Sequence, residues 1–274
     1  MTVAKLLATT GVQAMAMTVL MTVAWLAWRA SRNAGWIDTT WTFAVGAVGT
    51  ASALIGFDGA EVLPRQQLVA ALVAIWALRL GGHIAQRTMS SSDDPRYAAL
   101  VCDWGANAAS QMFKFVQIQA LVAIPLVVTI FLAAHTPAPQ LGLADWIGAA
   151  LLAFAIAGEA LADRQLRRFS AEPSSKGKVC DRGLWAWSRH PNYFFQWLGW
   201  LAYPVIALPS IGTFPWALLT LSGAFSVYWL LVHVSGIPPL EQHMENSRGD
   251  AFRSYRTRTS AFFPWPPKNS GARI

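Results

Sequence analysis

The sequence predicts an all-α integral membrane protein with about seven transmembrane helices, an N-terminus outside and a cytoplasmic C-terminus. Of its 274 residues, 54% are hydrophobic, 13% are charged and 14 are tryptophan, a composition too apolar for an ordinary soluble domain. Apolar stretches of membrane-spanning length recur along the whole chain. No internal repeat is visible, so residues 1–274 are expected to form a single polytopic membrane domain.

The predicted spans are apolar stretches of roughly 17 to 25 residues, the length that crosses a bilayer as a helix. The first stretch begins within the start "MTVAKLLATTGVQAMAM", which has one Lys and no typical small-residue cleavage site. We interpret it as a retained span, not a signal peptide. In order, the stretches are residues 5–28, 40–57, 66–86, 112–134, 145–163, 193–209 and 214–235.

Lys and Arg are concentrated in alternate connections, and only Lys5 and Arg65 fall on the opposite side. The positive-inside rule therefore predicts the stated orientation, which requires an odd number of spans. The longer polar connections lie on the cytoplasmic side and comprise residues 87–111, 163–192 and the tail from 236 onward. The cations on this side are Arg29, Arg32, Arg87, Arg96, Arg164, Arg167, Arg168, Lys176, Lys178, Arg182 and Arg189, and those of the tail from Arg248 to Arg273.

The net charge of +7 does not predict nucleic-acid binding, because the cations are segregated to one membrane face among apolar helices. Anionic lipid headgroups or an anionic cofactor are the expected partners. Cys102 and Cys180 both map to the cytoplasmic side, where thiols stay reduced. We expect no disulfide, and two cysteines without accompanying His spacing predict no metal site.

The fifth predicted span carries a polar stripe, because Glu159, Asp163 and Arg167 recur every four residues and so share one helical face. Ionisable residues at membrane depth are costly unless they are paired, which makes each a functional candidate. Two carboxylates and a guanidinium on one face suit a polyhydroxyl ligand. The alternative is an ordinary Asp–Arg pair at a helix end.

A second stripe at the same spacing, Arg79, His83 and Arg87, ends the third predicted span. Arg79 either belongs to a site or reaches the headgroups from the membrane edge. His83 either takes part in chemistry or is a packed, hydrogen-bonded interior histidine. The stripe alone leaves both alternatives open.

Asp38 lies between Trp36 and Trp41 at the start of the second predicted span. Tryptophans are expected at membrane interfaces, so they indicate little. An acid beside apolar rings is more informative, because it can hold a proton for transfer. The alternative is that Asp38 caps the N-terminus of the second helix.

The stretch "SRHPNYFFQW", residues 188–197, places Arg189 and His190 directly before Pro191. Proline favours the first position of a helix, which puts Asn192 and Tyr193 in the first turn. Free N–H groups and the helix dipole make such a terminus an anion site, and a phosphate is the expected ligand. The alternative is a basic flank that contacts lipid phosphate.

Four motifs, "GLWAWSRHPNYF", "GEALADRQLRRF", "SGIPPLE" and "YRTRTSAFFPWPP", together resemble the bacterial branch of the steroid 5-alpha-reductase family, of the DUF1295 type. Early "W-x-D-x-x-W" and "R-L-G-x-H" signatures add to the resemblance. It implies a helical bundle in the bacterial inner membrane that uses NADPH to reduce the C4–C5 double bond of 3-oxo-4-ene steroids, or a related sterol or lipid enone. Residues 145–267 would contain the cofactor-binding region, facing the cytoplasm.

The resemblance also implies roles for single residues. Asn192 and Tyr193 match a pair that contacts the cofactor, Trp185 matches an aromatic seven positions earlier, and Asp163 and Arg167 match polar positions on the fifth helix. Glu159 replaces an Asn of the animal enzymes, and Glu241 matches a tail contact only across a gap. The expected cofactor-binding residues are Glu159, Asp163, Arg167, Lys178, Arg182, Trp185, Arg189, His190, Asn192, Tyr193 and Glu241.

The expected catalytic residues are those that would hold the 3-keto oxygen, which in the animal enzymes are a glutamate and a tyrosine. Asp38 is the positional match for the glutamate. Tyr97 and His83 are competing candidates for the second role. Hydride addition to the β-carbon of an enone builds negative charge on the carbonyl oxygen, so an acid or strong donor must face that oxygen.

The alternative function is a membrane S-adenosylmethionine-dependent methyltransferase of the isoprenylcysteine or phospholipid type, which shares an Arg-His-Pro-x-Tyr element. Asn192 in the variable position, the "GEALAD" stripe and the predicted seven spans favour the reductase. Such methyltransferases usually have paired glutamates in the tail, where this chain has "PPLEQHME". A transporter or lipid-binding protein would not explain why the charges gather on the cytoplasmic side.

Overall fold

A computed structural model describes residues 1–56, 61–90, 95–137 and 140–268. The regular elements in these ranges are helices, and Ser188 and Ser260 form an isolated parallel bridge. The chain divides into two compact units, each built from two separate segments. The first comprises Met1–Gly148 and Tyr203–Gly223, and the second comprises Ala149–Ala202 and Ala224–Ile274.

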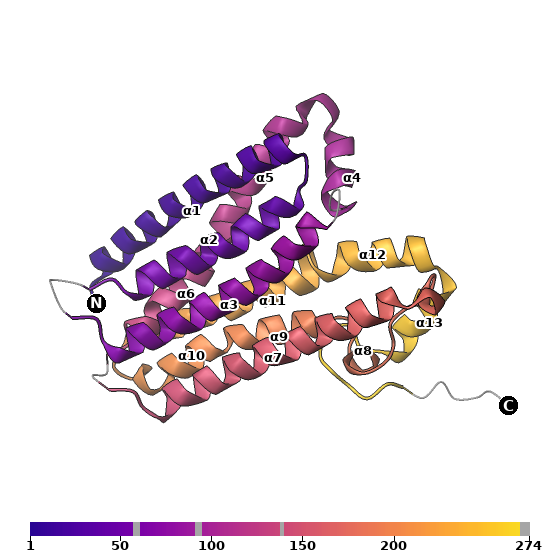
Figure 1. The fold of residues 1–274 in the computed structure, drawn as a ribbon. Helices are drawn as coiled ribbons and strands as arrows, with labels where there is room; N and C mark the ends of the chain where they lie inside the picture. The colour runs from indigo at the N-terminus through magenta and orange to yellow at the C-terminus, as the bar shows by residue number, and fades with distance from the viewer. Residues whose placement is uncertain (57–60, 91–94, 138–139, 269–274) are drawn as a thin grey trace. The chain divides into compact units, whose positions relative to one another are not determined.

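Long apolar helices form the first unit, and α2 packs against α1, α3, α5 and α6 within it. Figure 1 shows α1, α2 and α3 side by side. A Cβ on Gly46 of α2 would lie 2.2 Å from the Cβ of Ala77 on α3, so the close approach of these helices requires glycine. The helices are α1 Val3–Ser31, α2 Gly35–Ala53, α3 Pro64–Met89, α4 Pro95–Trp104, α5 Ala108–Val122, α6 Ile124–Ala134 and most of α10 Ala202–Ala207.

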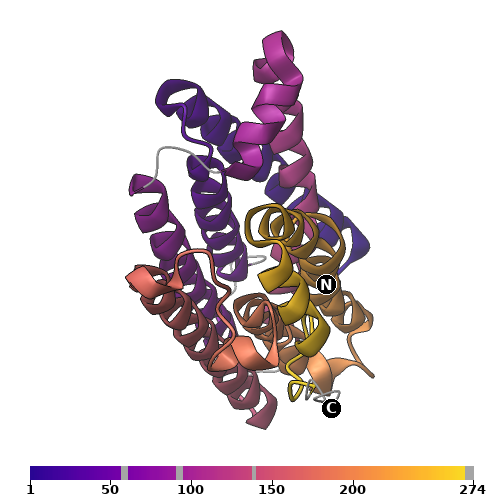
Figure 2. The ribbon, with the colours of Figure 1, turned by 90° about the vertical axis from the view of Figure 1, so that its right-hand side faces the viewer.

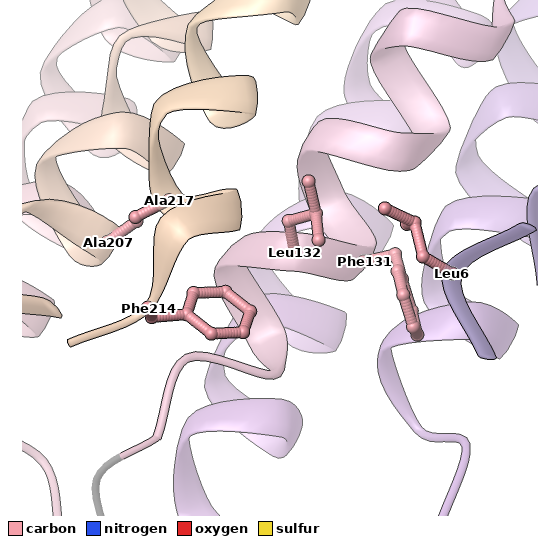
Figure 3. Packing of buried hydrophobic residues seen from close by; sticks show 6 residues of the cluster. All are labelled: Leu6, Phe131, Leu132, Ala207, Phe214 and Ala217. Carbon is pink, nitrogen blue, oxygen red and sulfur yellow. The ribbon is translucent and has the colours of Figure 1, made fainter. Parts of the chain in front are cut away.

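Apolar side chains close this unit at the end where α1 begins (Figure 3). Phe131 and Leu132 of α6 are fully buried among residues of α1, α10 and the 3-10 helix Pro215–Thr220. Segments far apart in the sequence are therefore held together by one cluster, which consists of Leu6, Phe131, Leu132, Ala207, Phe214 and Ala217.

A buried ion pair joins the first turn of α3 to the first turn of α7, Leu143–Ala171. Arg65 Nε and Nη2 each lie 2.7 Å from a carboxylate oxygen of Asp145. The side chains are 7% and 1% exposed. Arg65 also donates to the carbonyl of Thr136, and Asp145 accepts from the amide of Gly142. Arg65, expected from the sequence as a loop cation, is thus neutralised inside the protein.

Close helix contacts also form the second unit. A Cβ on Gly158 of α7 would lie 2.4 Å from the ring of Phe195 on α9, which requires glycine at this crossing. A five-residue π-helix, Leu230–Val234, follows α11 and leads through Ser235 and Gly236 into α12. Figures 1 and 2 both show α8 next to α13. Besides α7, the helices are α8 Leu184–Trp187, α9 Pro191–Trp200, α11 Leu221–Trp229, α12 Ile237–Arg248 and α13 Asp250–Arg258.

Five helical segments in the described ranges are long and apolar enough to cross a membrane: Val3–Ser31, Pro64–Met89, Tyr97–Ala134, Leu143–Ala171 and Pro215–Arg248. They coincide with five of the seven stretches predicted from the sequence. Of the other two, α2 is 19 residues long and is not one of these five segments. The stretch 193–209 is interrupted at Leu201, between α9 and α10.

The connections predicted as polar loops contain helices of their own. α4 lies in the connection 87–111, α8 in 163–192, and α12 and α13 in the tail. Part of the first connection, residues 91–94, lies outside the described residues. α12 and α13 are polar and α8 has only four residues, so hydropathy alone represents these segments as loops.

Candidate functional site

The N-terminus of α9 meets the polar stripe of α7 in the second unit. The helix begins at Pro191, as the sequence predicts. Asn192 Nδ2 donates to Asp163 Oδ1 over 3.3 Å, which joins two motifs 29 residues apart. Glu159 and Asp163 are 5% and 7% exposed, while Arg167 is exposed. The stripe therefore passes from a buried carboxylate to an accessible guanidinium.

Trp185 fixes the short helix α8 against α7. Its indole nitrogen donates to the carbonyl of Ala162 over 3.0 Å, and its own carbonyl accepts from the Tyr255 hydroxyl of α13. Gly183 has a φ of 62°, and a Cβ there would collide with Gln165. The segment that precedes "SRHPNYF" is thus held on two sides.

Basic residues surround the turn before α8. Lys178 is exposed, and the Arg182 guanidinium lies 5.1 Å above the ring of Phe169 while it pairs with Glu172. A cavity of about 290 Å³ opens beside them, lined by Gln165, Arg168, Phe169, Glu172, Arg182 and Gly183. Two guanidinium groups and an aromatic ring are thus presented on one accessible surface.

Arg189 and His190, expected next to phosphates, both contact Glu241 of α12. Arg189 Nε and Nη2 lie 2.7 and 3.1 Å from the two carboxylate oxygens of Glu241. Arg189 Nη1 donates to the carbonyls of Thr259 and Arg256 over 2.6 and 3.3 Å. The Arg189 side chain is only 9% exposed. Its donors are therefore used inside the protein, and a phosphate would have to compete with Glu241.

His190 is a buried residue whose Nε2 lies 3.0 Å from Glu241 Oε1. Burial lowers the pKa of His190 below its ordinary value; Glu241 opposes this effect, and the Arg189 charge adds to it. The imidazole is consequently neutral at pH 7, and its ring stacks on Tyr193 with centroids 5.5 Å apart. His190 supports the start of α9 as a neutral group and adds no positive charge there.

Asp38 and Tyr97 come together in the first unit. The Tyr97 hydroxyl donates to Asp38 Oδ1 over 2.6 Å, and the Tyr97 side chain is 5% exposed. The capping alternative for Asp38 is wrong, since Ala34 is the N-cap of α2 and the Asn33 side chain accepts from the amide of Gly35. The sequence offered Asp38 and Tyr97 as separate candidates, and the fold makes them one hydrogen-bonded pair.

Gln119 of α5 is a member of this cluster that sequence reasoning missed. Its Nε2 donates to the Tyr97 oxygen over 3.2 Å. Within the described ranges its Oε1 is buried without a hydrogen-bond partner. The available signal was an amide in an otherwise apolar span, where an unsatisfied polar group is costly.

The second stripe lies on α3, where His83 and Arg79 are half-buried and Arg87 is exposed. The structure shows that Tyr97, one of the two competing candidates for the second carbonyl contact, donates a hydrogen bond from its hydroxyl to Asp38.

The chain is similar to a family and to a relative whose functions are not described. The model of a family described as "Protein of unknown function (DUF1295)" matches residues 24–259. An uncharacterized protein of Schizosaccharomyces pombe is 28% identical over 142 residues, which cover 45% of this chain and 40% of that relative. The chain thus matches less than half the length of this relative. No solved structure matches the chain.

Proposed function

Because the chain belongs to the DUF1295 family, which includes steroid 5-alpha-reductase-like proteins, we propose that it is an NADPH-dependent oxidoreductase. Its reaction is the reduction of the C4–C5 double bond of a 3-oxo-4-ene steroid, or the double bond of a related sterol or lipid enone. The observation that carries this proposal is the hydrogen bond between Asn192 and Asp163. It unites the two motifs that favour a reductase over a methyltransferase.

The residues of the second unit fit a dinucleotide phosphate. Asn192, Asp163 and Tyr193 supply an amide, a carboxylate and an aromatic ring around the start of α9. The accessible Arg167, together with Lys178 and Arg182, would hold the phosphates. Arg189, His190 and Glu241 would position the cofactor-binding residues, because their contacts with one another hold the start of α9 in place. When bound, the nicotinamide supplies the hydride.

The cluster in the first unit suits the charge that develops on an enone oxygen. Gln119 donates to the Tyr97 oxygen, so the hydroxyl hydrogen of Tyr97 is left for Asp38 or for a substrate carbonyl. In the reaction, Tyr97 would donate to the carbonyl oxygen, and Asp38 would orient the Tyr97 hydroxyl. An oriented donor in a dry site stabilises the enolate more than water does.

The proposed setting is the bacterial inner membrane, with seven spans, the N-terminus outside and the cofactor-binding side in the cytoplasm. This orientation rests on the distribution of Lys and Arg along the sequence. The steroid or other lipid enone would enter from the bilayer.

Ligand-induced thermal stabilisation in detergent tests the cofactor. NADPH at about 100 times its dissociation constant should stabilise the protein by about 2.7 kcal/mol. NADH should stabilise it less, and S-adenosylmethionine should have no effect. The matching activity assay is NADPH oxidation by purified protein with a 3-oxo-4-ene steroid. Stabilisation by S-adenosylmethionine alone would establish the methyltransferase instead.

Replacement of Arg167 by alanine tests where the 2′-phosphate binds. We expect Arg167→Ala to weaken NADPH binding by about tenfold, the equivalent of about 1.4 kcal/mol, and to leave NADH binding unchanged. The affinities are measured by titration of each nucleotide. Lys176→Ala, which removes an exposed cation of the same connection, is the control and should leave both affinities unchanged. An equal loss for both nucleotides at Arg167 would contradict this placement.

A further inference from the structure

Three large aromatic side chains lie exposed where α8 meets the C-terminal segment. Trp187, Phe263 and Trp265, which we call the aromatic patch, are 48%, 48% and 69% exposed. The amide of Trp265 donates to the carbonyl of Trp187 over 2.9 Å, so α8 and the C-terminal segment present their aromatic residues together. Exposed aromatics in a cluster indicate an interaction surface.

The aromatic patch packs against a helix that belongs to a candidate membrane span. The ring of Phe263 packs 6.2 Å from Tyr228 of α11 and 5.6 Å from Trp197 of α9. α11 belongs to the candidate span Pro215–Arg248. It also exposes Phe225 and Trp229, which stack 6.4 Å apart. Trp265 follows Phe263 by two residues, a reach of at most about 7 Å, so the patch lies close to the helix that forms part of this candidate span.

Cations lie next to the patch. The amide of Lys268 donates to the carbonyl of Arg258 over 2.9 Å, which places these two basic residues side by side. Lys268 is exposed, and the Arg258 side chain is 38% exposed, with Asp181 at 3.4 Å. The segment thus combines aromatic rings that favour the membrane interface with cations that favour lipid phosphate.

The segment that carries the patch is held in a defined conformation. The amide of Arg189 donates to the carbonyl of Ser260 over 2.8 Å at one end, and the Lys268–Arg258 bond closes the other. Between them the sequence "FFPWPP" restricts the backbone through its prolines. The rings are therefore presented at little further cost in conformational entropy on binding.

We propose that the aromatic patch inserts into the interface of an anionic bilayer, with Arg258 and Lys268 against lipid phosphates. Tryptophan prefers this depth because its ring is apolar and its N–H is polar. Each cation near an anionic surface contributes about 1 kcal/mol, or about fivefold in occupancy. The C-terminal segment is then a membrane contact in its own right, independent of the chemistry proposed above.

Hydrogen exchange of the full chain in lipid nanodiscs tests this contact. With one copy per disc, the amides of Trp265 and Lys268 should exchange about fivefold more slowly in discs that contain phosphatidylglycerol than in pure phosphatidylcholine. Trp265→Ser should abolish the slowing caused by phosphatidylglycerol, so that exchange is equal in the two discs, whereas Trp265→Phe should retain most of the slowing. Lys268→Gln should weaken the dependence on anionic lipid, because it leaves Arg258 as the remaining cation of the proposed contact.

Two outcomes would overturn the proposal. One is exchange that neither phosphatidylglycerol nor Trp265→Ser alters. The other is protection that appears only in discs with two copies of the protein, which would make the patch a contact between copies. Since the Trp265 side chain is 69% exposed, Trp265→Ser leaves the core intact, and the comparison of wild-type protein in the two lipids needs no variant.

Discussion

Tyr97→Phe is expected to lower the rate of enone reduction by roughly 10²–10⁴-fold. The hydroxyl is the group that would face the carbonyl oxygen as negative charge builds on it, and phenylalanine keeps the buried ring while it removes that donor. Asp38→Asn should also lower the rate, because an amide oxygen is a weaker acceptor than a carboxylate and orients the Tyr97 hydroxyl less well. Single-turnover reduction of a 3-oxo-4-ene steroid measures the chemical step directly.

Cofactor binding provides the control for this experiment. NADPH-induced thermal stabilisation should survive Tyr97→Phe, since the proposed nucleotide contacts lie in other residues. His83→Ala separates the two candidates for the second carbonyl contact. If His83→Ala abolished the chemical step and Tyr97→Phe did not, the hydrogen bond between Tyr97 and Asp38 would be structural and His83 would be the donor.

Glu241→Ala is expected to destabilise the protein by about 3–5 kcal/mol. The substitution leaves the Arg189 guanidinium, which is 9% exposed, without its carboxylate. It also removes the acceptor of the His190 ring. Thermal unfolding in detergent measures the effect, and loss of NADPH binding at lower temperature than in the wild type reports it independently.

Glu245→Ala is the matched control, one turn further along α12. Glu245 pairs with Arg256, and these side chains are 37% and 46% exposed, so its loss should cost at most about 1 kcal/mol. Similar effects for the two variants would show that the Glu241 pair adds nothing beyond a surface bridge. A weaker NADPH affinity with unchanged thermal stability would instead make Glu241 a direct cofactor contact.

The positions of the long apolar helices were predictable, because a helix that crosses a bilayer must be apolar over a fixed length. Stretch length and hydropathy locate α1, α3 and α7 because a span must be apolar over a fixed thickness. The same reasoning joined α9 to α10 into one stretch, since hydropathy does not register the interruption at Leu201. Hydropathy did not predict α12 and α13, because their helical structure depends on packing against neighbours. An example is the hydrogen bond from the Tyr255 hydroxyl to the carbonyl of Trp185.

Local sequence rules predicted part of the candidate site. They did not predict the contacts between residues that lie far apart in the sequence. Four-residue spacing and the helix-starting role of Pro191 identified the residues that form the Asp163–Asn192 bond. Its charge and its place directly before a helix N-terminus assigned Arg189 to a phosphate, because the sequence does not reveal that its partner Glu241 lies 52 residues later. Gln119 was missed for a similar reason, since its role depends on Tyr97 of another helix.

The partnership of Arg189 with Glu241 and Thr259 also constrains the order of biogenesis. During translation, Arg189 leaves the ribosome long before these partners, and α9 follows it directly. A chain that terminates before residue 241 never acquires the carboxylate, so the contacts of the "SRHPNYF" segment form only after Glu241 and Thr259 have been made. Completion of the structure around the start of α9 therefore requires helices that are synthesised after it.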